Sequence, residues 1–311
     1  EPDHSGAVRA IVQEYPDVEV IGNAKTFAPL ESFYGPLNNK KIVAEGETLC
    51  LGKHTLQFFM VPMCHWPESM VTYEQTNKIL FSNDAFGGFG ALNGCIFDDE
   101  ANLDFYEDDM RRYYANIVGK VAAQAVKAVQ KLGPLDIKMI APSHGLVWRS
   151  NLHWVLDRYV KWSTGDNEEG VVIVYGSMYG NTALMADIIA RGVSEAGVKN
   201  IKIYDVAKTE VSHIISDIWK YKGAIIGACA HYGSVFPNMT LLLHELTEFK
   251  PKNKVYGVFG GMSWGGGGVK YINNVMEKNQ WECPVESVEV QGAPYRDEDV
   301  ERLYNMGKTI G

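Results

Sequence analysis

The second half of the chain alternates strand-like and helix-like segments five times, and this alternation limits the folds open to it. We expect strands over Val171–Tyr175, Asn200–Asp205, Gly223–Cys229, Val255–Phe259 and Val285–Val290. We expect helices over Thr182–Ala196, Val211–Lys220, Pro237–Phe249, Val269–Asn279 and Asp297–Lys308. Consecutive strand–helix units predict a doubly wound parallel sheet with helices on both faces. The first, third and fourth strands are almost wholly apolar, as strands buried on both faces should be.

The first half has a different pattern, because its short apolar runs end in polar clusters. These runs predict strands over His54–Met63, Lys78–Ser82 and Ile137–Ala141. Between the last two, Asp108–Leu132 has apolar residues at helical spacing and predicts one long helix. The segment Ser163–Gly170 is polar and ends in Gly, which is typical of a linker. We therefore expect an α/β chain with two domains, over residues 1–165 and 166–311.

Composition excludes several classes of protein. The chain has 311 residues, of which 46% are hydrophobic and 22% charged, as in an ordinary folded protein. Its net charge of -9 and lack of a basic run argue against nucleic acid as a partner. The longest apolar runs, such as Phe58–Pro62 and Ala224–Ala230, are far shorter than the ~20 residues of a membrane span. Five cysteines without a CxxC pair argue against a disulfide scaffold, a zinc ribbon or a rubredoxin-type iron site, and indicate a reducing cytoplasm.

A loop rich in hydroxyl groups follows the first strand of the second half. Residues 176–182 read GSMYGNT and lead directly into a predicted helix. Hydroxyls and free backbone N–H groups at the positive end of a helix dipole suit a phosphate. The loop is neither GxGxxG nor a Walker motif, and it has no Lys, so a phosphomonoester held by neutral donors fits best. The alternative is a plain polar strand–helix turn with a helix cap.

Two further loops leave the same predicted edge of the sheet. The third strand ends at residues 230–233 (AHYG), and the fourth ends at residues 260–268, where Trp264 stands among glycines. Aromatic residues and glycines there would flank a flat ring, although Trp264 could be a surface packing residue and His231 a plain loop histidine. The half from about residue 168 to 311 resembles flavodoxin, which implies FMN. The residues expected to bind it are Ser177, Met178, Tyr179, Gly180, Asn181, Thr182, Ala230, His231, Tyr232, Gly233, Gly261, Met262, Ser263, Trp264 and Gly265.

The first half offers six potential metal ligands: Glu1, Asp3, His4, His65, Asp84 and His144. The last three follow closely on predicted strands, so they can meet at one rim of a sheet. Taken singly, Asp84 could cap a helix and His144 could be a turn residue. Together the six resemble the binuclear site of the metallo-β-lactamase fold, with its H-x-[HE]-x-D-H, His, Asp and His stations. The first His of that motif would lie two residues before Glu1, so we expect a chain that starts partway through a larger protein, with an incomplete αββα domain.

The resemblance also implies a ligand arrangement. Hydrolases of this fold usually have His where this chain has Glu1 and bind zinc, whereas a carboxylate there makes the site richer in oxygen and favours iron. Asp84 would bridge two non-haem irons. Glu1 and His65 would bind one iron, and Asp3 and His144 the other. His4 is a ligand in some relatives and a supporting group in others.

The two halves together resemble the flavodiiron proteins, also called A-type flavoproteins. Other matching stretches are residues 65–70 (HWPESM), 81–87 (FSNDAFG), 141–145 (APSHG) and 264–266 (WGG). Members of the family reduce O2 to water, NO to N2O, or both. The four electrons that O2 needs match two stored on FMN and two on the diiron pair. The resemblance implies a head-to-tail homodimer, or a dimer of dimers, and a separate electron donor, either a rubredoxin or reduced coenzyme F420.

Two other functions fit the same residues. A dizinc hydrolase of the metallo-β-lactamase fold with an appended flavodoxin domain keeps the architecture, but Glu1 argues against it. A non-catalytic flavin electron carrier on a vestigial metal domain is the other, and the presence of both Asp84 and His144 argues against it.

Overall fold

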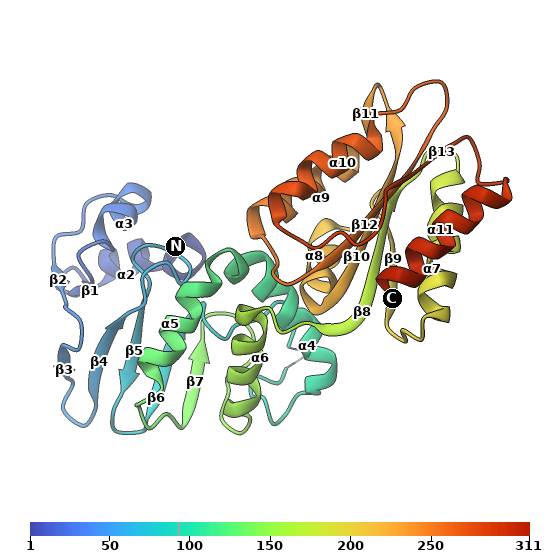
Figure 1. The fold of residues 1–311 in the computed structure, drawn as a ribbon. Helices are drawn as coiled ribbons and strands as arrows, with labels where there is room; N and C mark the ends of the chain where they lie inside the picture. The colour runs from blue at the N-terminus through green and yellow to red at the C-terminus, as the bar shows by residue number, and fades with distance from the viewer. Residues whose placement is uncertain (93) are drawn as a thin grey trace. The chain divides into compact units, whose positions relative to one another are not determined.

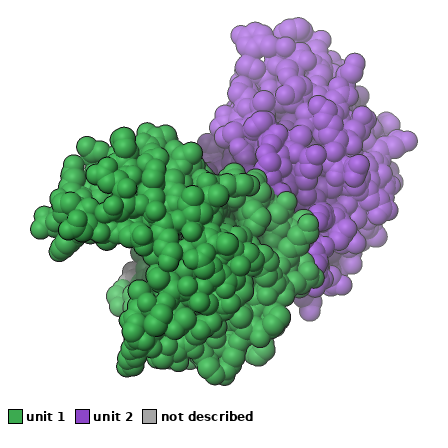
Figure 2. Space-filling model, turned by 90° about the vertical axis from the view of Figure 1, so that its left-hand side faces the viewer, with its two compact units in different colours: residues 1–114, 121–160 green, residues 115–120, 161–311 purple. Residues whose placement is uncertain are grey.

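The computed structural model describes residues 1–92 and 94–311, which divide into two compact units. Unit 1 comprises residues 1–114 and 121–160, and unit 2 comprises residues 115–120 and 161–311 (Figure 2). The main division therefore falls after residue 160, where the sequence places it after residue 165, and a short segment of the first half belongs to unit 2. Within the described ranges, no helix combines the length and apolar character that crossing a bilayer requires.

Unit 2 contains the parallel sheet that the alternation predicts (Figure 1). Its strand order is β13-β12-β10-β8-β9, and the short strand β11 pairs antiparallel with β10. The bounds are β8 Glu168–Gly176, β9 Ile201–Asp205, β10 Tyr221–His231, β11 Ser234–Val235, β12 Val255–Met262 and β13 Val288–Gln291. The chain order reverses between β8 and β10, and loops at such a switch point of a doubly wound sheet commonly form a ligand site.

Helices cover both faces of this sheet. One face carries α7 (Asn181–Glu195) and α11 (Asp297–Ile310). The other carries α8 (Val211–Lys220), α9 (Pro237–Phe249) and α10 (Gly268–Met276), which continues into the 3-10 turn η3 (Glu277–Asn279). Side chains of β8, β10, β12 and β13 pack with those of α7 and α11 in one apolar cluster. Burying both faces of the sheet explains why its central strands are almost wholly apolar.

Strand register brings the carboxyl ends of three strands to one edge. Gly176 of β8 lies opposite Ala228 of β10, and Ala228 lies opposite Gly260 of β12. The loops that follow these strands therefore start side by side. This edge is where the three predicted flavin loops meet.

Unit 1 is built on a mixed sheet of order β3-β4-β5-β6-β7, in which only β6 and β7 run parallel. The bounds are β3 Thr48–Cys50, β4 Thr55–Met60, β5 Met70–Glu74, β6 Ile79–Asn83 and β7 Met139–Pro142. A separate parallel pair joins β1 (Val20–Gly22) to β2 (Lys40–Ile42). The three predicted strands of this half are present as β4, β6 and β7, whereas β1, β2, β3 and β5 were not predicted.

The single helix predicted over Asp108–Leu132 is wrong. The helices of the first half are α1 Pro2–Ser5, α2 Val8–Glu14, α3 Phe27–Tyr34, α4 Leu103–Tyr113, α5 Ala122–Leu132 and α6 Leu152–Thr164. Between α4 and α5 the backbone forms a π turn, η1 (Tyr114–Val118), and a 3-10 turn, η2 (Gly119–Val121). Gly119 lies against the ring of Trp219, and a Cβ at Gly119 would be 2.6 Å from a ring carbon. Glycine lowers helix propensity and allows this approach, so a tertiary contact accompanies the break.

The predicted linker Ser163–Gly170 is also wrong. Its first two residues end α6, and its last three begin β8. The polar side chain between them is bonded to backbone: Asn167 Nδ2 donates to the carbonyl oxygens of Lys252 and Asn253, each at 3.0 Å. Asn253 Nδ2 in turn donates to the Gly165 carbonyl at 3.0 Å. The polar residues that suggest a linker in the sequence instead form hydrogen bonds, which join this segment to the residues just before β12.

Two glycines set how closely α7 and α11 approach. A Cβ at Gly192 would lie 2.1 Å from the Tyr304 carbonyl oxygen, and a Cβ at Gly307 would lie 2.1 Å from the Ile189 carbonyl oxygen. These distances are far below van der Waals contact, so the two helices touch backbone to backbone. Replacing Gly307 with Ala should destabilise unit 2 by about 1–3 kcal/mol through overpacking.

Thermal melting of the full chain measures this. We expect the melting temperature of unit 2 to fall by several degrees in the Gly307→Ala variant. Glu301→Ala is the control, because Glu301 is exposed on the same helix α11 and should change stability by less than about 0.5 kcal/mol. Equal melting temperatures for Gly307→Ala and the original chain would contradict the close contact.

Candidate functional site

The polar cluster of unit 1 forms where two parallel strands end. Asp84 follows β6 and His144 follows β7, and these strands are neighbours in the sheet. Asn83 has a left-handed backbone with a φ of 56°. The two loops are joined by backbone hydrogen bonds, from Ser143 N to the Asn83 carbonyl at 2.8 Å and from Gly88 N to the His144 carbonyl at 3.3 Å. These bonds hold Asp84 and His144 on one rim.

The turn after His144 depends on a glycine. Gly145 has a φ of 81°, and a Cβ there would lie 2.0 Å from the Tyr106 hydroxyl oxygen. That hydroxyl accepts a hydrogen bond from Leu146 N at 3.2 Å. A residue with a side chain would be strained in this backbone and would also displace Tyr106. The glycine thus allows the turn that directs His144 toward Asp84.

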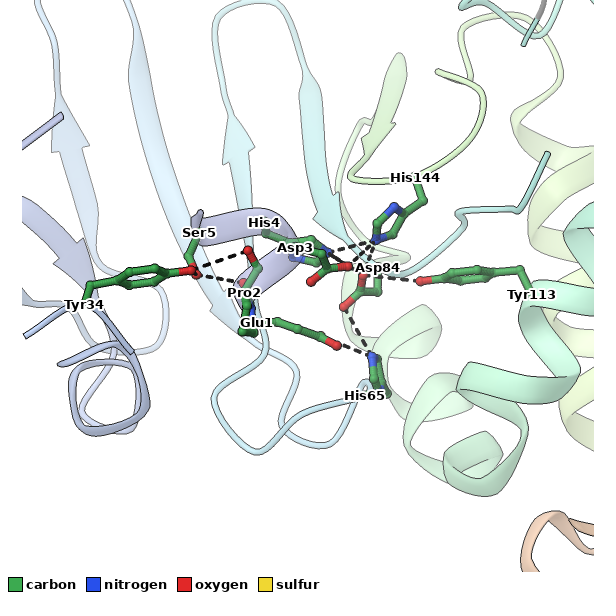
Figure 3. A network of polar contacts seen from close by, with 10 residues as sticks. All are labelled: Glu1, Pro2, Asp3, His4, Ser5, Tyr34, His65, Asp84, Tyr113 and His144. Atoms are coloured by element: carbon green, nitrogen blue, oxygen red, sulfur yellow. Dashed lines mark hydrogen bonds and ion pairs between the residues drawn. The ribbon is translucent and has the colours of Figure 1, made fainter. Parts of the chain in front are cut away.

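Three potential ligands come from the segment at α1, which Figure 3 shows beside Asp84. Ser5 Oγ donates to the Glu1 carbonyl at 2.8 Å and closes this short turn. Ser5 Oγ also lies 3.1 Å from the hydroxyl of Tyr34, at the end of α3. One short turn therefore presents Glu1, Asp3 and His4 from a single support.

The six predicted ligand residues gather as two groups of three. Glu1, His65 and Asp84 form one group, and Asp3, His4 and His144 form the other. Within each group the ligand atoms lie within 4.8 Å of one another. His65 Nε2 is 3.3 Å from Glu1 Oε2, and His144 Nε2 is 3.1 Å from Asp3 Oδ2. His4 belongs to the second group, since its Nε2 is 3.0 Å from that of His144.

Asp84 lies between the two groups and is only 3% exposed. Its Oδ1 faces the second group, 2.9 Å from His4 Nε2 and 3.5 Å from His144 Nε2. Its Oδ2 faces the first group, 3.7 Å from His65 Nε2. A carboxylate whose two oxygens point to two separate ligand sets can bridge two cations. Three carboxylates and three imidazoles are an oxygen-rich donor set that fits iron.

Burial changes the acid–base properties around Asp84. The Tyr113 hydroxyl donates to Asp84 Oδ1 at 3.3 Å, and burial, followed by the Asp84 charge, raises the pKa of that phenol. Burial also raises the pKa of the Glu1 carboxyl, against the opposing effect of His65. Burial and the nearby Asp84 raise the pKa of the Cys64 thiol to about 12. Cys64 is therefore a neutral thiol near pH 7.

The loops at the edge of the unit 2 sheet enclose a pocket. It is lined by Ser177, Met178, Tyr179, Asn181, Thr182, Cys229, Ala230, Gly261, Met262, Ser263 and Gly292. Gly180, with a φ of 90°, caps α7, and its N–H donates to Ser177 Oγ at 3.0 Å. The pocket therefore combines the start of a long helix, hydroxyl groups and glycine backbone. This combination fits a phosphate attached to a larger ring system.

Other residues predicted for this site lie outside the pocket lining. They are Gly180, His231, Tyr232, Gly233, Trp264 and Gly265. Tyr232 and Trp264 are each 92% exposed. Tyr232 is in a two-residue turn between β10 and β11, with a φ of 49°, and its ring meets that of His231 edge to face. Both aromatic rings are thus accessible to a partner or a cofactor.

Two lining residues were missed from the sequence. Cys229 is near the end of β10, just before the predicted loop, and burial raises the pKa of its thiol. Gly292 follows β13, and its N–H donates to the Met262 carbonyl at 2.8 Å. The other loops were predicted because they follow the carboxyl ends of parallel strands, where ligands bind. Gly292 also follows the carboxyl end of a strand, so the same rule could have found it.

Comparison with known proteins identifies the family of this chain. Residues 1–145 match the family described as ODP family beta lactamase, and residues 173–302 match Flavodoxin. A protein named nitric oxide reductase from Moorella thermoacetica is 33% identical over 100% of this chain and 78% of its own length. The chain belongs to the flavodiiron protein family.

Further flavodiiron proteins agree with this assignment. The anaerobic nitric oxide reductase flavorubredoxin of Escherichia coli is 32% identical over 96% of the chain, which spans only 63% of that relative. The solved structure of rubredoxin oxygen:oxidoreductase from Desulfovibrio gigas matches with a TM-score of 0.95 and 31% identity, over 100% of this chain and 78% of that one. The flavodiiron protein of Giardia intestinalis matches with a TM-score of 0.93 and 25% identity, over 98% and 75%.

The comparisons confirm the predicted fold class, a β-lactamase-like domain followed by a flavodoxin-like domain. Membership in a family whose relatives are named as oxidoreductases confirms the prediction of an oxidoreductase. A flavin and iron are the cofactors that this family implies.

Replacing Asp84 with Ala should remove the group that both ligand sets share. We expect metal bound per chain to fall from two ions toward none, because each set is left with fewer donors and the imidazoles lose a buried partner. Flavin content should stay unchanged, since the flavin pocket is in unit 2. Metal analysis of the purified variant measures this.

Asp136→Ala is the control for the Asp84 variant, because Asp136 is an exposed carboxylate that pairs with Lys78 and Lys138 before β7. Asp136→Ala should retain full metal content. Two ions per chain in Asp84→Ala would disprove the bridging assignment.

Proposed function

We propose that this flavodiiron protein reduces O2 to water, NO to N2O, or both, at a diiron centre that receives electrons through FMN. The observation that carries the proposal is Asp84, whose two carboxylate oxygens face two separate ligand sets. A single-metal site has no use for this arrangement. Relatives named nitric oxide reductase and rubredoxin oxygen:oxidoreductase support the choice of substrates.

In this proposal each metal would have its own set of side-chain ligands. Glu1 and His65 would hold one iron, and Asp3 and His144 the other, with His4 on the second side and Asp84 between the two sets. When bound, FMN and two irons would supply two electrons each, which matches the four-electron requirement of O2 reduction. The Tyr113 hydroxyl fixes the orientation of Asp84 through its bond to Oδ1. Burial of Asp84 limits water around the shared carboxylate.

In unit 2, residues 177–182 at the start of α7 would bind the phosphate of FMN. The hydroxyls of Ser177 and Thr182 and the backbone N–H groups of that turn supply neutral donors. The loops at residues 230–233 and 261–265 are then placed to flank the isoalloxazine ring. Trp264 and Tyr232 have most of their surface free to contact it.

We further propose a separate electron donor, either a rubredoxin or reduced coenzyme F420, and a head-to-tail homodimer or a dimer of such dimers. A two-fold contact of that kind would allow the flavin of one chain to serve the irons of its partner. We also propose that the protein works in the cytoplasm, in line with its five unpaired cysteines.

Metal and flavin analysis combined with gas consumption tests the function. We expect iron and FMN in the purified protein, and consumption of O2 or NO when a reduced donor is supplied. Steady-state rates with each gas, on one preparation with one donor, determine the preferred substrate. Two zinc ions and no iron would favour a hydrolase, and bound FMN and iron without gas consumption would favour an electron carrier.

Replacing Trp264 with Ala should weaken or retune the bound flavin and leave the iron in place. The exposed indole would otherwise stack on the ring, and an aromatic contact with a base or ring is worth about 1–3 kcal/mol. The FMN dissociation constant and the flavin midpoint potential are the measurements.

Tyr295→Ala serves as the comparison for the Trp264 variant, because Tyr295 is another exposed aromatic residue of unit 2 outside the pocket lining. It should leave both quantities unaffected. If Trp264→Ala also leaves flavin affinity and potential unaltered, the stacking role is rejected.

A further inference from the structure

Glu289, in the edge strand β13, has a buried carboxylate oxygen that the proposed function does not use. Its Oε1 is buried and has no hydrogen-bond partner in the part of the chain that the structure describes. A buried polar atom without a partner is costly, and a folded protein contains few of them. The position of this one therefore requires a reason.

Strand pairing places Glu289 close behind the flavin pocket. Its neighbours Val288 and Val290 point to the apolar cluster with α7 and α11, so Glu289 points to the opposite face of the sheet. There its carboxylate lies against Gly266, where a Cβ would be 3.0 and 3.1 Å from the two carboxylate oxygens. The same Cβ would be 3.1 Å from Met262 Sδ. Met262 also lines the pocket, so the carboxylate and the pocket share Met262 and the Gly266 segment as neighbours.

The loop over this carboxylate is fixed to the same strand. Gln291 Nε2 donates to the Ser263 carbonyl at 3.1 Å, and Gly292 N donates to the Met262 carbonyl at 2.8 Å. Gln291 and Gly292, two and three residues after Glu289, are therefore hydrogen-bonded to the wall of the flavin pocket.

We propose that Glu289 lowers the reduction potential of the flavin. The inference rests on the proposed function, because it requires FMN in this pocket. Reduction of FMN by two electrons with uptake of one proton leaves one added negative charge on the ring. A partly buried carboxylate beside the pocket repels that charge, so the protein binds reduced flavin less tightly than oxidised flavin. A lower potential increases the driving force for electron transfer from the flavin to the irons.

The test is the midpoint potential of FMN bound to the full chain, measured by spectroelectrochemistry in the original protein and in Glu289→Gln. We expect the variant to bind reduced FMN about tenfold more tightly relative to oxidised FMN, which raises a two-electron potential by about 30 mV. Glu289→Asp keeps the charge and should stay close to the original potential. Glu289→Ala replaces the Gln variant in the comparison if the latter does not fold.

Glu282→Gln is the matched control. Glu282 is exposed and bridges to Val255 at the start of β12, at the opposite end of the sheet from the flavin loops. Its removal changes the net charge equally and should leave the potential unchanged. An unshifted potential in Glu289→Gln, or an equal shift in Glu282→Gln, would overturn the inference. A lower melting temperature without a change in potential would also overturn it, because Glu289 would then be structural.

The results distinguish a failure of this inference from a failure of the proposed function. If the original chain binds no FMN, the proposed function fails and the inference fails with it. If FMN binds and its potential does not respond to Glu289→Gln, only the inference fails.

Discussion

The Asp84 carboxylate is the interaction on which unit 1 depends. It is buried beside three imidazoles, and its two oxygens face different ligand sets. Without cations, three carboxylates in this small space repel one another, and burial already makes ionisation of Glu1 less favourable. Cations relieve this repulsion. The strand ends, the glycine turn after His144 and the hydroxyl of Tyr113 all hold groups around that one carboxylate.

Both units form their sites by the same means. In unit 1 the parallel neighbours β6 and β7 place Asp84 and His144 together, and in unit 2 the parallel strands β8, β10 and β12 place three loops together. Parallel strands end on the same side, so residues far apart in the sequence become neighbours once the register is set. In each unit, glycines at these ends let backbones approach where a side chain would collide.

This arrangement explains what the sequence could predict. Apolar runs ending in polar residues identified Asp84, His144 and the flavin loops, because the strand signal and the site signal adjoin. The break between α4 and α5 could not be predicted, since Trp219 contacts Gly119 from one hundred positions along the chain. The false linker had the same origin, because Asn167 is polar but bonds to Lys252 and Asn253. In the sequence Glu289 is an ordinary strand residue, because its proximity to Gly266 is visible only in the folded structure.

The support of the ligands at α1 has a mechanical consequence. Glu1, Asp3 and His4 come from one turn, His65 from the connection between β4 and β5, and Asp84 and His144 from the ends of β6 and β7. Two metal ions bound at this point would act as a cross-link between segments as far apart in the chain as Glu1 and His144. Such a cross-link would close long loops and restrict the unfolded chain, so metal binding would stabilise unit 1 against unfolding.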